Sequence, residues 1–225
     1  METSLTTLRR PAASGKPQWL TVFLHGYGSS GAELMSFADY WQSSMPDVAF
    51  AAPDGPAPAR DGGFQWIGKR PAGDPRLHDD AVEAAPALHA FLDAELAQNN
   101  LGPDRLALVG FSQGTVMALH LGLRRAVAPA AVLGFSGGLV GADRLSSEIT
   151  SKPPVMLVHG EQDALAPLYG MMMSVKTLSQ AGVVCQGLPI PGLGHEVNAD
   201  ALIYGARFLL SAFAFRARHA APDAG

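Results

Sequence analysis

The segment "VGFSQGTVMALHLGL", residues 109–123, places a serine at G-x-S-x-G spacing between a strand-like run and a helix-like pattern. Gly110 and Gly114 stand two residues before and two residues after Ser112. Apolar residues at helical spacing follow, so the segment predicts a strand, a sharp turn and a helix. Because such a turn exposes a strained serine at the end of a strand, Ser112 is the candidate nucleophile. A tight turn without chemistry is the alternative.

The segment "LGFSGGLVG" repeats this spacing around Ser136 and offers a second candidate. Glycines at positions 137, 138 and 141 follow this serine and disfavour a helix. Without a helix, Ser136 would lack both the dipole and the backbone amide that stabilise an oxyanion. We therefore expect Ser136 to be a loop serine at the end of a strand.

Short apolar runs alternate with helical patterns along the rest of the chain. Most of the runs are apolar throughout, which is typical of strands covered on both faces. This alternation predicts an α/β fold with a mostly parallel, doubly wound sheet. The expected strands are 19–25, 48–53, 105–111, 130–136, 154–160 and 183–189. The expected helices are 31–44, 79–98, 114–126, 167–181 and 198–215.

The length of 225 residues, 48% of them hydrophobic, predicts a single domain over 1–225. We expect an edge strand and a leader within 1–16 and a frayed tail at 217–225. Residues 52–77 are rich in proline and glycine and lack a helical period, which is typical of a long functional loop. The connection 137–153 is too short for a large cap domain.

Composition limits the partners and cofactors that we expect. A net charge of −4 gives no basic surface for nucleic acid. The single cysteine, Cys185, fits a reducing cytoplasm. The sequence shows neither a signal peptide nor an integral membrane segment. The histidines match no metal motif, and Gly26, Gly28 and Gly31 have the wrong spacing for a dinucleotide site, so we expect no metal and no cofactor.

A serine hydroxyl becomes a strong nucleophile when a positioned base takes its proton. In a doubly wound sheet, catalytic groups gather beyond the carboxyl ends of the strands, in the chain order serine, acid, histidine. Glu161 and Asp163 follow one late strand, and we prefer Asp163 as the orienting acid, with Glu161 in reserve. Of the seven histidines, His195 alone lies in the glycine-rich loop directly after the last expected strand, and it is the candidate base. His25 and His159 end strands, where we expect hydrogen bonds to backbone.

Two backbone N–H groups are needed to stabilise the oxyanion of an acyl-transfer reaction. One should belong to Gln113, directly after Ser112. The other should lie in the loop after an early strand, where "FLHGYGSSG" places Tyr27 between glycines that let the loop fold back. An ordinary glycine-rich turn is the alternative for this loop.

Four segments, "FLHGYGSSG", "LVGFSQG", "VHGEQD" and "PGLGHE", together resemble the phospholipase/carboxylesterase family of α/β-hydrolases, which includes the acyl-protein thioesterases. The resemblance covers most of the chain. It implies an α/β-hydrolase fold in which Ser112 is the nucleophile, Asp163 the acid and His195 the base. It also implies oxyanion amides at Tyr27 and Gln113. The "HGYG" and "QW" segments are more similar to the bacterial carboxylesterase branch than to the thioesterases.

The resemblance implies a serine carboxylesterase whose partner is a small-molecule ester with a small-to-medium acyl group, thioesters included. Acyl-protein thioesterase and lysophospholipase activities are alternatives within the family. An amidase or peptidase is a further alternative, because the same triad serves both reactions. A non-catalytic binding module is another, and the oligomeric state stays open, with a homodimer among the options.

An ester's apolar part needs cover that excludes water. Because the connection 137–153 is short, we expect the 52–77 loop to supply this cover through Phe64, Trp66 and Ile67. The segment "FQWIGKR" also resembles the aromatic segment that lines the family's substrate site. The alternative is that Trp66 packs on the core and holds the loop down.

Overall fold

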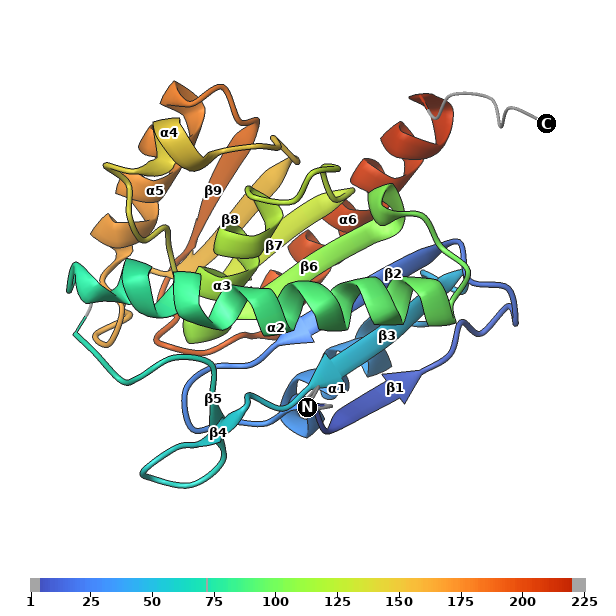
Figure 1. The fold of residues 1–225 in the computed structure, drawn as a ribbon, viewed down its shortest axis with the longest axis horizontal. Helices are drawn as coiled ribbons and strands as arrows, with labels where there is room; N and C mark the ends of the chain where they lie inside the picture. Colours follow the sequence, from blue (N-terminus) through green and yellow to red (C-terminus); the bar gives the residue numbers. More distant parts are fainter. Residues whose placement is uncertain (1–4, 72, 220–225) are drawn as a thin grey trace.

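The computed structural model describes residues 5–71 and 73–219, which are arranged around a seven-stranded sheet (Figure 1). The strand order is β1-β3-β2-β6-β7-β8-β9; β1 pairs antiparallel with β3, and all other neighbours are parallel. The strands are β1 (Thr7–Arg10), β2 (Trp19–Leu24), β3 (Val48–Pro53), β6 (Leu106–Phe111), β7 (Ala131–Phe135), β8 (Val155–Gly160) and β9 (Cys185–Ile190). The predicted α/β class and the six predicted strands are confirmed, and β1 is the edge strand expected near the N-terminus.

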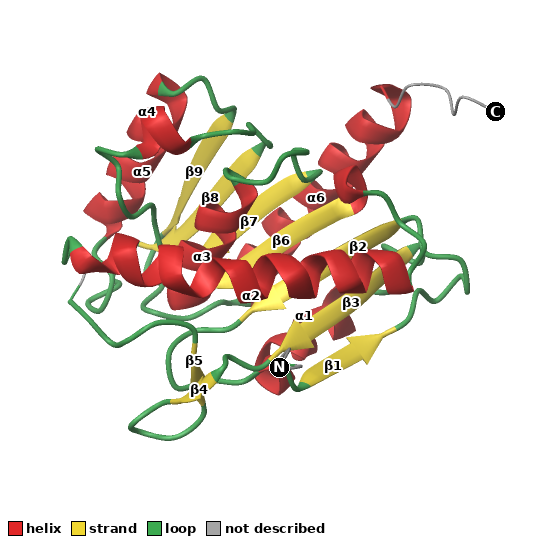
Figure 2. Cartoon of the chain, in the orientation of Figure 1, coloured by secondary structure: helices red, strands yellow, loops and turns green. Residues whose placement is uncertain are grey.

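Helices cover both faces of the sheet (Figure 2). They are α1 (Gly31–Trp41), α2 (Arg76–Gln98), α3 (Gln113–Gly122), α5 (Leu168–Gln180) and α6 (Ala199–His219). Helices α2, α3 and α5 lie on one face, and α1 and α6 lie on the other. Side chains alternate between faces along a strand, so Leu108 of β6 enters the core under α2 and α3 while Val109 enters the core under α1 and α6. This double cover explains why the central strands β2, β3, β6, β7 and β8 are apolar at nearly every position.

The direction of the connections reverses at β2. The chain passes from β2 to β3 on one side and then returns to β6 on the other side of β2. Crevices at the carboxyl ends of strands form where an α/β sheet reverses its order in this way, and ligands bind there. Ser112 follows β6 and Tyr27 follows β2, so the fold brings both to this crevice.

Residues 52–77 contain more regular structure than the sequence predicts. β4 (Ala57–Pro58) and β5 (Phe64–Gln65) form a small antiparallel hairpin, and α2 begins at Arg76, inside the expected loop. The turn needs left-handed backbone, which Gly62 (φ 101°) and Gly63 (φ 63°) supply. The glycines therefore encode a hairpin turn rather than an irregular loop.

The chain ends also differ from expectation. Helix α6 continues to His219, so residues 217–219 are helical, while 220–225 and residues 1–4 of the expected leader lie outside the described residues. The short connection after β7 contains only α4 (Leu145–Glu148), in keeping with the absence of room for a large cap. A one-turn 3₁₀ helix, η1 (Pro103–Arg105), precedes β6. Within residues 5–71 and 73–219, no helix has the length and apolar character needed to cross a membrane.

Candidate active site

Ser112 occupies a strained turn between β6 and α3. Its backbone has φ 52° and ψ −113°, in a region that side-chain-bearing residues rarely adopt. The flanking glycines are required by close packing: a Cβ on Gly110 would lie 2.3 Å from the Gly114 backbone, and a Cβ on Gly114 would lie 1.8 Å from the Leu24 carbonyl oxygen. The G-x-S-x-G spacing therefore allows the strand and helix to approach while the serine projects from the turn.

Two hydrogen bonds hold the strained turn from beneath. The Ser112 N–H donates to the Phe135 carbonyl (2.8 Å). The fully buried Thr115 hydroxyl lies 2.8 Å from the same carbonyl and 2.9 Å from the Gly110 carbonyl. A threonine three residues after the serine is typical of a residue that caps the turn, but its partners here, the Gly110 and Phe135 carbonyls, belong to different strands and meet only in the folded sheet.

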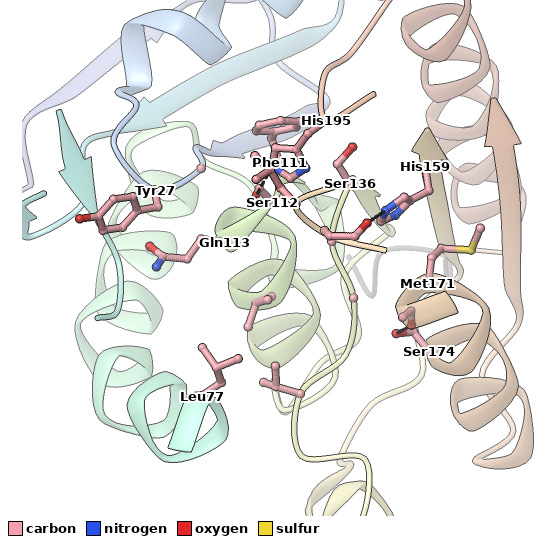
Figure 3. A pocket seen from close by; sticks show the side chains of 18 of the residues that line it. Tyr27, Leu77, Phe111, Ser112, Gln113, Ser136, His159, Met171, Ser174 and His195 are labelled. Carbon is pink, nitrogen blue, oxygen red and sulfur yellow. Dashed lines mark hydrogen bonds between the residues drawn. The ribbon is translucent and has the colours of Figure 1, made fainter. Parts of the chain in front are cut away.

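The structure brings Ser112, His195 and Asp163 together through hydrogen bonds, and Ser112 and His195 are seen side by side in Figure 3. His195 Nε2 lies 3.0 Å from the Ser112 hydroxyl, and His195 Nδ1 lies 2.7 Å from Asp163 Oδ2. The His195 side chain is 18% exposed, whereas the Asp163 side chain is fully covered. The ring of Phe111 packs against the imidazole at a centroid distance of 5.0 Å. One face of the histidine is therefore shielded while the ring stays in reach of the cavity.

The environment of Asp163 favours its charged form. Burial raises the pKa of this carboxyl, but hydrogen bonds from the Ala166 N–H, His195 and the Leu165 N–H outweigh burial, so the pKa lies below its ordinary value. The amides of Ala166 and Leu165 lie 2.8 Å and 3.0 Å from Oδ1. Oδ2 is thereby left to orient His195. The reserve acid, Glu161, is exposed and does not contact His195 within the described residues.

Ser136 shares one unexpected property with Ser112. It also has left-handed backbone, with φ 48°, and it lines the same cavity. No helix begins after it, as expected, and the imidazole of His195 hydrogen-bonds Ser112 instead. Ser136 lies where β7 ends and the chain turns close to the Ser112 turn. The approach is tight, because a Cβ on Gly137 would lie 2.6 Å from the Ser112 carbonyl oxygen.

The two residues expected to supply oxyanion amides both line the cavity beside Ser112 (Figure 3). Gln113 is the first residue of α3, where backbone N–H groups lack partners inside the helix. Tyr27 lies in the loop after β2. Within the described chain, neither N–H donates a hydrogen bond to another protein group. Both amides are thus free to meet an anionic oxygen.

The 52–77 loop braces both sides of this amide pair. The Gln113 side-chain oxygen accepts from the Trp66 N–H (2.8 Å), and its amide nitrogen donates to the Ile67 carbonyl (2.8 Å). On the other side, the Gly28 N–H donates to the Phe64 carbonyl (2.9 Å). The side chain of Gln113 therefore has a role that the sequence did not reveal, because its partners are more than forty residues away.

A cavity of about 1010 Å³ opens around Ser112. On one side it is lined by apolar side chains from the 52–77 loop, α2, α3 and the loop after β7, and on another by residues of α5, including Met171 (Figure 3). Its apolar lining on the first side consists of Ile67, Leu77, Val116, Leu139 and Val140.

Of the three residues expected to cover the acyl group, only Ile67 lines this cavity. Trp66 is 4% exposed, donates from Nε1 to the His25 carbonyl (2.8 Å) and packs on the His25 ring at 4.9 Å. Phe64 contributes backbone pairing to the hairpin and to the Gly28 loop. The expectation for Trp66 and Phe64 is therefore corrected: the indole bonds the His25 carbonyl, next to the loop after β2, and holds the 52–77 loop down.

The other strand-end histidines bond backbone groups as predicted. His25 Nε2 accepts from the Gly55 N–H (2.9 Å), and Nδ1 lies 2.7 Å from the Gly26 carbonyl. Burial lowers the pKa of His25, which favours the neutral ring that these two bonds require. His159 Nε2 lies 2.6 Å from the Ala166 carbonyl. Across the described residues, no group of three or more potential metal ligands is found.

Comparison with known proteins places this arrangement in a family. A family model described as phospholipase/carboxylesterase matches residues 11–210. Acyl-protein thioesterase 1 of Schizosaccharomyces pombe is 28% identical over 193 residues, covering 81% of this chain and 85% of that protein. Carboxylesterase SOBER1 of Arabidopsis thaliana is 27% identical over 198 residues, covering 81% and 86%. The crystal structure of esterase PE8 matches with a TM-score of 0.89 and 37% identity, covering 93% of this chain and 99% of that one.

Proposed function

Because this chain belongs to the phospholipase/carboxylesterase family of α/β-hydrolases, we propose that it is a serine carboxylesterase that works through an acyl-enzyme on Ser112. The observation that carries the proposal is the unbroken chain of contacts from Asp163 through His195 to Ser112, at 2.7 Å and 3.0 Å. These are the distances at which a base can take the proton of a serine hydroxyl.

In the first half of the reaction, His195 Nε2 takes the proton of Ser112 as the hydroxyl oxygen attacks the ester carbonyl. Asp163 keeps the Nδ1–H tautomer of His195 and stabilises the imidazolium that forms. The carbonyl oxygen becomes an oxyanion, and the N–H groups of Tyr27 and Gln113 stabilise it. His195 then passes its proton to the departing alkoxide, which leaves as the alcohol, and the acyl group stays on Ser112.

In the second half, a water molecule gives a proton to His195 and attacks the acyl carbonyl. As the tetrahedral intermediate collapses, His195 returns this proton to the departing Ser112 oxygen and the carboxylic acid is released. Preorganisation lowers the barrier for both halves, because the 52–77 loop holds both proposed oxyanion amides before substrate binds.

The proposed substrate is a small-molecule ester with a small-to-medium acyl group. The apolar side of the cavity, formed by residues such as Leu77 and Val116, suits an alkyl chain. Thioesters enter the same mechanism, since a thiolate leaves more readily than an alkoxide. We also propose a cytoplasmic location, on the ground of the single free cysteine, Cys185. All residues of the site come from one chain, so the chemistry does not require a homodimer.

Labelling with a fluorophosphonate probe tests the nucleophile directly. We expect the probe to modify Ser112, and Ser112→Ala to abolish labelling and to lower aryl-ester hydrolysis by about 10⁴-fold or more. Ser136→Ala is the matched control, because Ser136 has the same spacing and a similarly strained backbone; it should keep its labelling. If labelling disappears in Ser136→Ala but persists in Ser112→Ala, the nucleophile is Ser136 and the assignment of Ser112 is wrong.

A substrate series separates the alternatives. Aryl esters, thioesters and anilides with the same acyl groups of increasing length should show the fastest turnover for esters or thioesters. Turnover of anilides at a rate comparable to esters would favour an amidase. Absence of labelling and of turnover in a folded protein would favour a binding module.

A further inference from the structure

His159 is a buried histidine beside Asp163 that the proposed mechanism does not use. It lies in β8, is 2% exposed, and its Nε2 lies 2.6 Å from the Ala166 carbonyl and 3.3 Å from Asp163 Oδ2. A carbonyl oxygen only accepts, so Nε2 carries the proton. Nδ1 is buried and has no partner within the described chain, which suits an unprotonated nitrogen. The ring therefore presents one N–H to the segment around the acid.

Ala166 connects His159 to the carboxylate a second time. Its carbonyl accepts from His159, and its own N–H donates to Asp163 Oδ1 at 2.8 Å. The neighbouring Leu165 N–H donates to the same oxygen at 3.0 Å. The loop that holds Oδ1 is thus itself held by His159. Oδ2 faces two histidines, His195 at 2.7 Å and His159 at 3.3 Å.

We infer that His159 is a positioning residue that fixes the orientation and charge distribution of Asp163, and through it the tautomer of His195. The inference rests on the proposed function, because it concerns the residue that positions Asp163, the proposed catalytic acid. His159 acts in two ways: its N–H partly neutralises the charge on Oδ2, and its bond to Ala166 keeps the two Oδ1 donors in place. The titratable groups that face His159 within the described chain are Asp163 and, across the carboxylate, His195.

The test compares His159→Phe, which keeps the ring but removes the donor, with His159→Gln, whose amide can donate from the position of Nε2. Without the N–H, more of the carboxylate charge acts on His195, so its protonated form is stabilised. We expect the acid limb of the kcat/KM profile to move to higher pH in His159→Phe. We also expect kcat to fall by about 10-fold to 100-fold, the loss typical of a hydrogen bond to a charged group. His159→Gln should restore both.

The low-field proton resonance of the His195–Asp163 hydrogen bond is read in the same folded samples and does not depend on turnover. It should shift in His159→Phe and return in His159→Gln. His120→Phe is the control, because it replaces a similarly buried histidine (3% exposed) that does not contact Asp163 within the described chain. An unmoved resonance and an unmoved acid limb in His159→Phe would overturn the inference. Failure of the proposed function is read separately, as the absence of fluorophosphonate labelling at Ser112 in the unmodified protein.

Discussion

Ser112 carries a conformational cost that its neighbours offset. Left-handed backbone at a residue with a side chain costs roughly 1–3 kcal/mol. The Ser112 N–H bond to Phe135 and the Thr115 hydroxyl between two strand carbonyls keep the turn in this conformation. The fold therefore stabilises a serine whose oxygen points away from the backbone and toward His195. The strain and the proposed chemistry have one structural cause, the abrupt change from β6 to α3.

At the same scale, Asp163→Asn should lower kcat by about 10⁴-fold while the fold persists. An asparagine amide that turns its nitrogen toward Nδ1 favours the wrong tautomer of His195 and cannot stabilise the imidazolium. Steady-state kinetics together with circular dichroism measure the two parts of this prediction.

Glu161→Gln is the matched control, since Glu161 is a carboxylate two residues away that is exposed. It should leave kcat within about threefold of the unmodified value, because a surface charge of this kind interacts weakly with its surroundings. A severe loss in Glu161→Gln together with a mild one in Asp163→Asn would reverse the assignment of the acid.

At the scale of elements, the 52–77 loop braces the proposed oxyanion amides and, through Ile67 and Leu77, also forms part of the cavity lining. Trp66, which bonds the His25 carbonyl, and Gln113 at the start of α3 attach this loop to both proposed oxyanion amides. Burial of the indole supplies the binding energy, and the backbone bonds supply the geometry. The proposed acyl cover comes from Ile67 together with side chains of α2, α3 and the loop after β7, and not from Trp66.

Trp66→Ala should therefore lower thermal stability strongly, since truncating a buried tryptophan costs roughly 3–5 kcal/mol. Activity should fall by a similar factor for every acyl length, because the amides lose support while the acyl cavity keeps its lining. Melting temperature and an aryl-ester chain-length series measure both effects.

Leu77→Ala is the contrasting variant, because Leu77 lines the cavity and is only half-buried. It should shift the preferred acyl length with a smaller loss of melting temperature. A length profile that changes in Trp66→Ala and not in Leu77→Ala would return the tryptophan to the acyl site.

Local patterns predicted the elements well and their contacts poorly. The strands and the sharp turn at Ser112 could be predicted from apolar runs and glycine spacing, because these patterns span only a few consecutive residues. The hairpin at 57–65 was missed because proline and glycine encode both irregular loops and tight turns. The position of Trp66 was misjudged because its partners, His25 and Gln113, are about forty residues away on either side in the chain. Long-range hydrogen bonds of this kind leave no periodic signal.

At the scale of the whole molecule, a cluster of two buried histidines, His78 and His120, joins helices and takes no part in the proposed mechanism. His120 of α3 packs against His78 of α2 with ring centroids 5.7 Å apart. His78 Nε2 lies 3.2 Å from Glu148 of α4, which also pairs with Arg124 at 2.6 Å. The cluster thus ties α2, α3 and α4 together behind the apolar side of the cavity. We expect this cluster to make the stability of the molecule depend on pH.

His120 should contribute a measurable pH dependence to the free energy of unfolding. Burial, with a further contribution from nearby Arg124, lowers its pKa to about 3 from an ordinary value of 6.5. Between these two values the unfolded chain binds a proton that the folded chain does not, so the unfolding free energy falls as pH falls through this window and is unaffected by His120 above it. Chemical denaturation of the unmodified protein and of His120→Gln from pH 7.5 down to pH 4.5 should therefore give curves that run parallel above about pH 7 and diverge below about pH 6. There the slope should be smaller in His120→Gln by up to about 1.4 kcal/mol per pH unit.

His219→Gln, an exposed change at the end of α6, should keep the slope of the unmodified protein. Equal slopes in all three proteins would mean that the folded state admits a proton at His120, and that the α2–α3–α4 junction opens more easily than its burial indicates.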